Sequence, residues 1–484
     1  MSNKGVAASE RGGEDKRSSA LSDRREGGRP AITGETIAVS RRSLIAVIAA
    51  ILLLRFASRI SFVILGFYLG RHFASVTIVA LVLEMFYVSE FTLSPIVGSL
   101  SDRKGRKPFL LLSAILAAGA ASCFLLAARL FPHPGIHSSN FGLFLFLLII
   151  LVGRLLEGSA TGTNVPATLG YITDVTVNSE SLRARMVTAF EIATMAGMVL
   201  AIPIAGKISS TLDTWGFLIV IAIYIASLLF IALGMEESLG AQAVGHNRRF
   251  AWREDLMVIR HKRIFSFLPA WFSVNALVGA WSVLITIMLA YPNPAADRRH
   301  PAQLLYGGFS QMSATLWVGL FALVFLVGMG VWTPLLPRMR RTTIMLIALA
   351  GLAMTAIALS IINSLADNPQ SLPHSAHPAV ALLLLLALVG ILLLSGFTPV
   401  ALTQMSALAE TLPGKNGAVM GLYSVVMAVG QLLGAMLGAV SVDRDGFYGL
   451  MIFSVAMGIL ALVSVLYVRI NAHDQTSARR VAWT

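Results

Sequence analysis

Charged residues and cysteine are scarce in this chain, and each shortage excludes a class of protein. Of the 484 residues, 13% are charged and 56% are hydrophobic. Soluble globular domains carry about 25% charged residues, so the composition excludes an ordinary soluble protein. The single cysteine, Cys123, lies within an apolar run, which excludes a disulfide framework and argues against a metal site built from thiolates.

Motifs of enzymes are missing as well. The sequence contains no H-E-x-x-H, no G-x-S-x-G and no phosphate-binding P-loop. We therefore expect no enzymatic activity, no catalytic residues, no metal and no cofactor. Lys and Arg outnumber Asp and Glu by 37 to 24. No basic patch interleaved with aromatic residues accompanies this excess, so nucleic acid is not an expected partner.

Long apolar runs make up most of the chain. About 20 apolar residues in a helix cross the ~30 Å hydrocarbon layer of a bilayer. Because the apolar residues are continuous rather than alternating, they predict spanning helices and not strands. Twelve runs are long enough, namely 43–69, 75–98, 108–131, 141–171, 184–207, 214–234, 264–291, 313–336, 342–365, 378–408, 417–440 and 447–470. The expected fold class is an all-α membrane protein with twelve transmembrane helices in two six-helix bundles.

Polar segments divide the chain around these bundles. Residues 1–42 lack aromatic residues and are rich in Gly, Ser, Arg and Glu, which predicts a disordered tail. The basic segment 248–263 predicts either an amphipathic helix on the membrane surface or a solvated linker. The predicted domains are the tail over 1–42, an N-terminal bundle over 43–234, a linker over 235–263, a C-terminal bundle over 264–470 and a second tail over 471–484.

The distribution of cations predicts the orientation of the helices. Membrane proteins concentrate the Lys and Arg residues of their loops on the cytoplasmic side. With the N-terminus inside, the inner loops hold most of the loop cations, and the outer loops and helix ends hold Arg71, Arg129, Lys207, Arg298, Arg299 and Arg444. Both termini and the tails are therefore expected in the cytoplasm, in a chain that crosses the cell membrane (plasma or inner) many times.

The short loop between the second and third spans carries a motif. Residues 98–107 read GSLSDRKGRK. This stretch resembles the loop motif G-x-L-x-D-R-x-G-R-[KR] of the major facilitator superfamily, whose defined positions are filled by Gly98, Leu100, Asp102, Arg103, Gly105, Arg106 and Lys107. A shift of 235 residues brings Arg103 onto Arg338 and Arg106 onto Arg341, in a second copy that lacks the aspartate and the internal glycine.

The resemblance implies a twelve-helix transporter that works by alternating access. It also implies that Asp102 engages the eleventh helix in the facing half and helps to latch the cytoplasmic side shut. Physical chemistry agrees, because an anion is stabilised at the N-terminus of a helix, and the eleventh span is expected to begin on that side near Gly417. Asp102 is thus expected to act as a conformational switch rather than as a substrate ligand.

Charged residues inside the predicted spans are few, and each one invites a functional hypothesis because its insertion costs at least about 2.5–3.5 kcal/mol. They include Arg55 and Arg59 in the first span, Glu84 in the second, Arg154 and Glu157 in the fourth and Glu191 in the fifth. One interpretation is a structural lock, in which Arg154 pairs with Glu157 and Arg55 or Arg59 pairs with Glu84. The other is a proton-coupling site, in which carboxylates carry the protons, since all nine histidines fall in loops or tails.

Two further stretches bear on the type of transport. The fourth-span stretch RLLEGSATG resembles a superfamily motif found in many proton-driven transporters, with Glu157 where glutamine is commoner. The fifth-span stretch GMVLAIPIAG resembles, in degenerate form, the glycine- and proline-rich motif associated with antiporters. The spans of the C-terminal half hold no charge at their midpoints, and we expect Trp271, Asn275, Thr398 and Gln404 to line a cavity there.

The leading hypothesis is a monomeric, proton-coupled exporter of amphipathic or hydrophobic small molecules. Uptake or exchange of an organic anion is the alternative, because three intramembrane arginines are more positive charge than a pump for lipophilic cations requires. A non-transporting membrane sensor or a polytopic enzyme is a remote third possibility. The sequence does not distinguish a sodium gradient from a proton gradient.

Overall fold

The computed structural model describes residues 41–73, 75–132, 140–176, 179–238, 262–291, 303–366, 371–410 and 416–481, and the regular elements in these ranges are all helices. The first half of the chain forms α2 (Arg41–His72), α3 (Val76–Lys104), α4 (Lys107–Leu130), α5 (Asn140–Val175), α6 (Glu180–Leu212) and α7 (Gly216–Gly234). The second half forms α9 (Lys262–Ala290), α10 (Gln311–Trp332), α11 (Arg341–Asn363), α12 (His377–Leu394), α13 (Phe397–Glu410), α14 (Asn416–Asp445) and α15 (Phe447–Val481). Three short 3-10 helices complete the described elements: η1 (Asp213–Trp215) between α6 and α7, η3 (Thr333–Leu335) after α10, and η4 (His374–Ala376) before α12.

The prediction of twelve spanning helices in two bundles of six is confirmed. In the described residues, eleven stretches are long and apolar enough to cross a membrane. One of them, Arg185–Gly234, runs through both α6 and α7, and another, His374–Met405, joins η4, α12 and most of α13 into one span. Several helices extend beyond the predicted spans, because an apolar run marks only the part of a helix inside the hydrocarbon layer.

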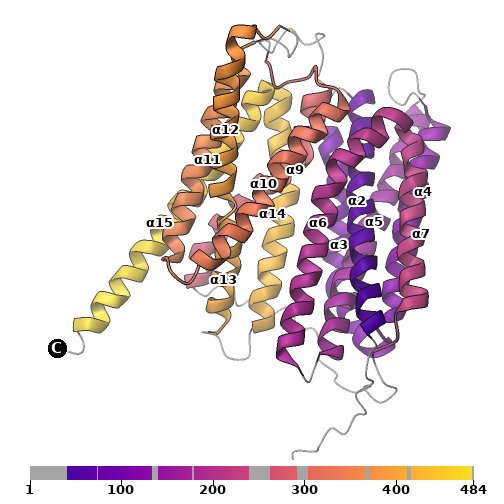
Figure 1. The fold of residues 1–484 in the computed structure, drawn as a ribbon, viewed down its shortest axis with the longest axis horizontal. Coiled ribbons are helices and arrows are strands. Elements are labelled where there is room, and N and C mark those ends of the chain that lie inside the picture. The colour runs from indigo at the N-terminus through magenta and orange to yellow at the C-terminus, as the bar shows by residue number, and fades with distance from the viewer. Residues whose placement is uncertain are drawn as a thin grey trace, which may run out of the picture.

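The two halves lie side by side, with α6 packed against α10 and α3 packed against α14 between them (Figure 1). We call the end of the molecule where α2 begins and α15 ends the terminal face, and the other end, where α3 and α10 begin, the opposite face (Figure 1). Successive spans alternate in direction between these two faces, with α12 and α13 running the same way in one span, so every functional position can be assigned a depth along its helix.

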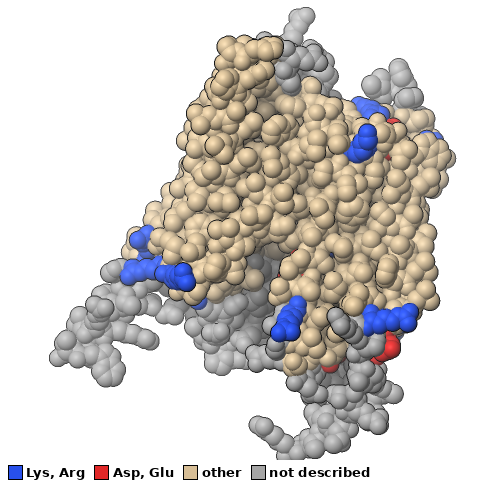
Figure 2. All heavy atoms as spheres, viewed as in Figure 1, with Lys and Arg blue, Asp and Glu red and all other residues tan. Residues whose placement is uncertain are grey.

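The outer surface is that of a membrane protein. Large apolar side chains point outward, with exposed fractions of 75% for Leu233, 73% for Phe141 and 68% for Leu382. On the side shown in Figure 2, the visible Lys and Arg side chains lie near the two faces, and a broad band of other residues separates them. Such a band would be unfavourable in water but fits the hydrocarbon layer of a bilayer. The chain is a multi-pass membrane protein.

The halves are in close contact toward the opposite face. Thr315 of α10 is fully buried there, and its side chain packs against Gly206 of α6. Pro203 packs against Gly319 one turn further along the same pair of helices. Toward the terminal face, Figure 2 shows the surface hollowed between the two halves. The described residues of the two halves are thus in contact toward the opposite face, and their surface is hollowed between them toward the terminal face.

Candidate functional site

The intramembrane charges of the N-terminal half converge around Glu84 of α3. Glu84 lies eight residues after the start of its helix, which places it about 12 Å below the opposite face in a layer ~30 Å thick. Arg59 of α2 and Arg154 of α5 both act on its carboxylate electrostatically. The structure therefore brings together, near the middle of the membrane, charges that the sequence places on three separate helices.

Arg154 and Glu157 form a buried ion pair within α5. Each residue is only 2% exposed, and an Arg154 guanidinium nitrogen (Nη1) donates to Glu157 Oε2. Their spacing of three residues puts both side chains on one side of the helix. Ser58 of α2 donates to Glu157 Oε1 at 3.2 Å, and Arg154 Nε donates to the carbonyl oxygen of Leu83 at 2.9 Å. The pair is thus tied to both neighbouring helices, α2 and α3.

Glu84 itself has no such partner. The residue is 2% exposed, and its Oε2 atom makes no hydrogen bond within the part of the chain that the structure describes. No ion pair joins Glu84 to Arg55 or Arg59 among these residues, so the second pairing of the structural lock is absent. Burying an unpaired charge costs several kcal/mol, and binding a proton removes that cost. The arrangement suits a carboxylate that gains and loses a proton.

Arg59 and Arg55 occupy the same side of α2 but differ in their surroundings. Arg59 donates to the carbonyl oxygen of Ser282 on α9 at 3.2 Å, so it crosses from one half to the other. The Arg59 guanidinium also lies 4.8 Å from the ring centre of Phe62. Arg55 Nε is buried without a hydrogen bond among the described residues. Arg55 acts electrostatically on Glu191, whose side chain is exposed on α6.

A polar chain continues from the charges into the C-terminal half. The Tyr87 hydroxyl, one turn from Glu84, donates to Gln431 of α14. Gln431 Nε2 in turn donates to Asn275 Oδ1 of α9 at 3.4 Å, and Asn275 Nδ2 donates to the carbonyl oxygen of Trp271 at 2.8 Å. The two halves therefore meet at the level of the buried charges through phenol and amide groups.

The other residues expected to line a cavity lie in different surroundings. Trp271 is 2% exposed and packs in an apolar cluster of the C-terminal half. Thr398 and Gln404 are half-buried on α13, and Gln404 Oε1 accepts a hydrogen bond from Arg341 at 3.1 Å, near the terminal face. Of the four side chains, that of Asn275 is the one hydrogen-bonded to Gln431 in the polar chain. A cavity-lining role for all four stays a prediction.

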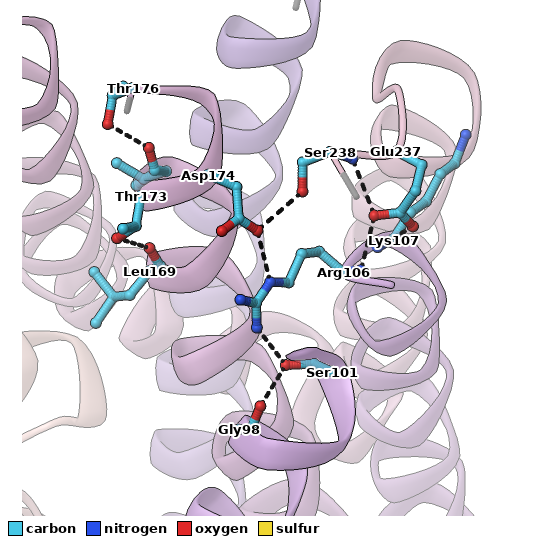
Figure 3. Close-up of polar contacts among 11 residues, drawn as sticks. Gly98, Ser101, Arg106, Lys107, Leu169, Thr173, Asp174, Thr176, Glu237 and Ser238 are labelled. Carbon is cyan, nitrogen blue, oxygen red and sulfur yellow. Dashed lines mark hydrogen bonds and ion pairs between the residues drawn. The ribbon is translucent and has the colours of Figure 1, made fainter. Parts of the chain in front are cut away.

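The loop motif holds the N-terminal half together at the terminal face (Figure 3). Arg106 is 7% exposed, and its Nε atom donates to Asp174 at the end of α5 at 2.9 Å. Its Nη1 atom donates to Ser101 at 2.8 Å, and Ser101 donates to the carbonyl oxygen of Gly98 at 2.9 Å. In the C-terminal half, Arg341, which the internal repeat aligns with Arg106, donates a hydrogen bond to Gln404 Oε1.

Gly105 and the residues after it connect the same loop to the end of α7. Gly105 has φ 99°, a backbone conformation that favours glycine, and a Cβ atom there would lie 2.7 Å from Glu237 Oε2, so the Glu237 carboxylate would have to shift. The Glu237 carboxylate accepts from the backbone N–H groups of Arg106 at 2.8 Å and Lys107 at 3.0 Å, which begin α4. Lys107 Nζ donates to the carbonyl oxygen of Met235 at 2.7 Å.

The predicted latch at Asp102 cannot be placed from the described side chains. Asp102 and Arg103 belong to the last turns of α3, and their side chains lie outside the described residues. The contact of Asp102 with the eleventh helix stays a prediction.

Sequence reasoning did not identify Ser58, Tyr87 or Ser282 as site residues, because each becomes important only through a partner on another helix. Their one signal in the sequence is a hydroxyl group inside an apolar span.

Comparisons with known proteins agree with this architecture. The sequence model of the Major Facilitator Superfamily matches residues 47–411 and 308–482. The fold is similar to that of the nucleoside transporter NupG, with a TM-score of 0.62 and 12% identity over 88% of this chain and 98% of that one. It is also similar to a bacterial homologue of the iron transporter ferroportin in its inward-facing state, with a TM-score of 0.65 and 14% identity over 88% and 98%.

A third similar structure is a D-xylose-proton symporter, with a TM-score of 0.57 and 15% identity over 88% of this chain and 96% of that one. At such identities the likeness shows the fold, while the sequence match over most of the chain shows the family. Together with the twelve-helix fold and the loop motif, these matches place the protein among transporters rather than enzymes, and the chain belongs to the Major Facilitator Superfamily.

Proposed function

We propose that this transporter works by alternating access and exports amphipathic or hydrophobic small molecules in exchange for protons. The observation that carries the proposal is Glu84, a buried carboxylate with an oxygen that makes no hydrogen bond among the described residues. Ionisable residues inside membrane spans commonly mark proton pathways. Glu84 has two arginines near it, and any movement of the halves that shifts Arg59 changes the free energy of its charged form.

The position of Glu84 couples proton binding to movement. Arg59 contacts the C-terminal half through Ser282, and Tyr87 contacts it through Gln431. A separation of the halves at this level would break both contacts and release the Arg59 side chain from Ser282, so that its guanidinium group is free to shift relative to Glu84. Proton binding at Glu84 and rearrangement of the halves would then be coupled. This is the coupling that an exchanger requires.

The proposed substrate follows from the composition of the two walls. The N-terminal half offers charged groups, whereas the C-terminal half offers the amides of Asn275 and Gln431 beside apolar and aromatic side chains. A site with one polar wall and one apolar wall suits amphipathic solutes.

We further propose that the terminal face is cytoplasmic, that the protein acts as a monomer in the cell membrane, and that the hollow between its halves opens inward. Likeness to a ferroportin homologue in its inward-facing state supports this orientation.

An organic anion is the second candidate for the substrate. Arg55 Nε is buried without a hydrogen bond among the described residues, so one strong donor stands ready for a carboxylate or phosphate. Transport of a fluorescent organic anion under an imposed gradient, with no movement of a fluorescent lipophilic cation, would favour this candidate over the export of amphipathic compounds.

Glu84→Gln tests the proton coupling. Glutamine keeps the shape of the side chain but binds no proton at physiological pH, so transport driven by a pH gradient in vesicles is expected to be lost. Exchange of labelled for unlabelled substrate across the same membrane, which needs no net proton movement, is expected to persist. Glu236→Gln is the matched control, since Glu236 is exposed at the end of α7. Normal gradient-driven transport by the Glu84 variant would exclude Glu84 as the coupling residue.

A further inference from the structure

The halves are joined at the opposite face by an aspartate that caps a helix of the other half. Asp443, near the end of α14, accepts three hydrogen bonds from the first residues of α3 and its N-cap. Its Oδ1 atom accepts from Val76 N at 2.7 Å, and its Oδ2 atom accepts from Thr77 N at 3.0 Å and from Ser75 Oγ at 2.7 Å. Ser75 and Asp443 are 368 positions apart in the chain, so the contact serves no local folding role.

The electrostatics favour this contact. The first backbone N–H groups of a helix have no partner within the helix, and they carry the positive end of its dipole. A carboxylate satisfies two of these groups here, and hydrogen bonds to a charged acceptor are stronger than neutral ones. Because Asp443 and α3 belong to different halves, this stabilisation exists only while the halves are together at the opposite face.

We propose that Asp443 is a latch that holds the opposite face shut and must release α3 each time the transporter changes state. The inference rests on the alternating-access function proposed above and adds a positioning residue to it. The latch predicted at the terminal face would use the same interaction between a carboxylate and a helix N-terminus with the roles exchanged, because there Asp102 of α3 would face the beginning of α14. The pair α3 and α14 would then carry one latch at each end, of which only one can be closed at a time.

Release of the latch can be measured without knowing the substrate. Thr315 is fully buried between α6 and α10 near the latched face, so a cysteine there reacts with a polar thiol reagent only when that face opens. We would place Thr315→Cys in a Cys123→Ser background and label purified protein in detergent. Asp443→Asn is expected to speed the labelling about tenfold, because it removes the charge and turns one acceptor into a donor. Ser75→Ala removes one of the three hydrogen bonds to Asp443, together with the N-cap bond from Ile78 N, and is expected to speed it less.

Two controls separate a latch from general damage. Asp445→Asn changes a neighbouring carboxylate that lies 3.8 Å from Arg444 and is 46% exposed, and it is expected to leave the labelling of Thr315→Cys unchanged. Ser227→Cys reports unfolding, because Ser227 is fully buried in α7, and its labelling is expected to stay slow in the Asp443 variant.

Three results would overturn the proposal: unchanged labelling of Thr315→Cys in the Asp443 variant, an equal rise in the Asp445 variant, or a parallel rise at Ser227→Cys. Failure of the proton-coupling proposal is distinguishable from these results. It would appear as normal pH-driven transport by the Glu84 variant, with the labelling of the Asp443 variant still faster.

Discussion

Arg154→Met is expected to destabilise the transporter by about 3–5 kcal/mol and to abolish transport, because the Glu157 carboxylate would remain buried without its cation. Glu157 is 2% exposed, and Ser58 also donates a hydrogen bond to its carboxylate. The carbonyl oxygen of Leu83 would lose its donor at the same time. The midpoint of thermal unfolding in detergent and transport in vesicles are the two measurements.

The double variant Arg154→Met, Glu157→Leu distinguishes a lock from a coupling site. An apolar pair of similar volume can replace a buried ion pair with little loss of stability, so the unfolding midpoint is expected to recover most of the way. Transport is expected to remain absent, since the proton-coupling hypothesis requires charges at this level of the membrane. Full recovery of transport together with stability would mean that the pair acts only as a structural lock.

The features that follow from local sequence were predicted well. The twelve spans were recognised because the length of an apolar run is sufficient to identify a helix that crosses a bilayer. The pairing of Arg154 with Glu157 was part of one of the two interpretations of the intramembrane charges, since a spacing of three residues puts two side chains on one side of a helix. The family resemblance came from a loop motif within ten consecutive residues.

The contacts between the halves could not be predicted from local patterns. Tyr87 and Gln431 are separated by 344 positions, and nothing in either apolar run specifies which helix lies opposite. Asp443 lies beyond the predicted end of its span at residue 440, where it resembles an ordinary loop residue. Two of its three donors are backbone N–H groups, which every sequence supplies equally, and the third is the Ser75 hydroxyl. These positions depend on how the two bundles pack, and that is decided by many side chains together.

The close contact of α3 with α5 beside the charge cluster depends on Gly158. A Cβ atom at this position would lie 2.0 Å from the carbonyl oxygen of Phe86 and 2.3 Å from Ser89 Oγ. Ser89 Oγ also donates to the carbonyl oxygen of Leu155 at 2.8 Å, which joins the two helices at the same level. Backbone atoms cannot move aside as a flexible side chain can, so any larger residue must push the helices apart.

Gly158→Ala is therefore expected to destabilise the protein by about 1–3 kcal/mol or more and to reduce transport strongly. Separating α3 from α5 moves Glu84 away from Arg154, so the cost falls on the coupling site as well as on packing. Gly119→Ala is the matched control, because its nearest atom, Leu156 Cδ1, would lie 4.0 Å away, and alanine in a helix interior is favoured over glycine by about 0.5–1 kcal/mol. A lower unfolding midpoint for the first variant and an equal or higher one for the second is the expected pattern. Equal stability of both would show that α3 and α5 can separate at this level without cost, and that the close approach does not position the charges.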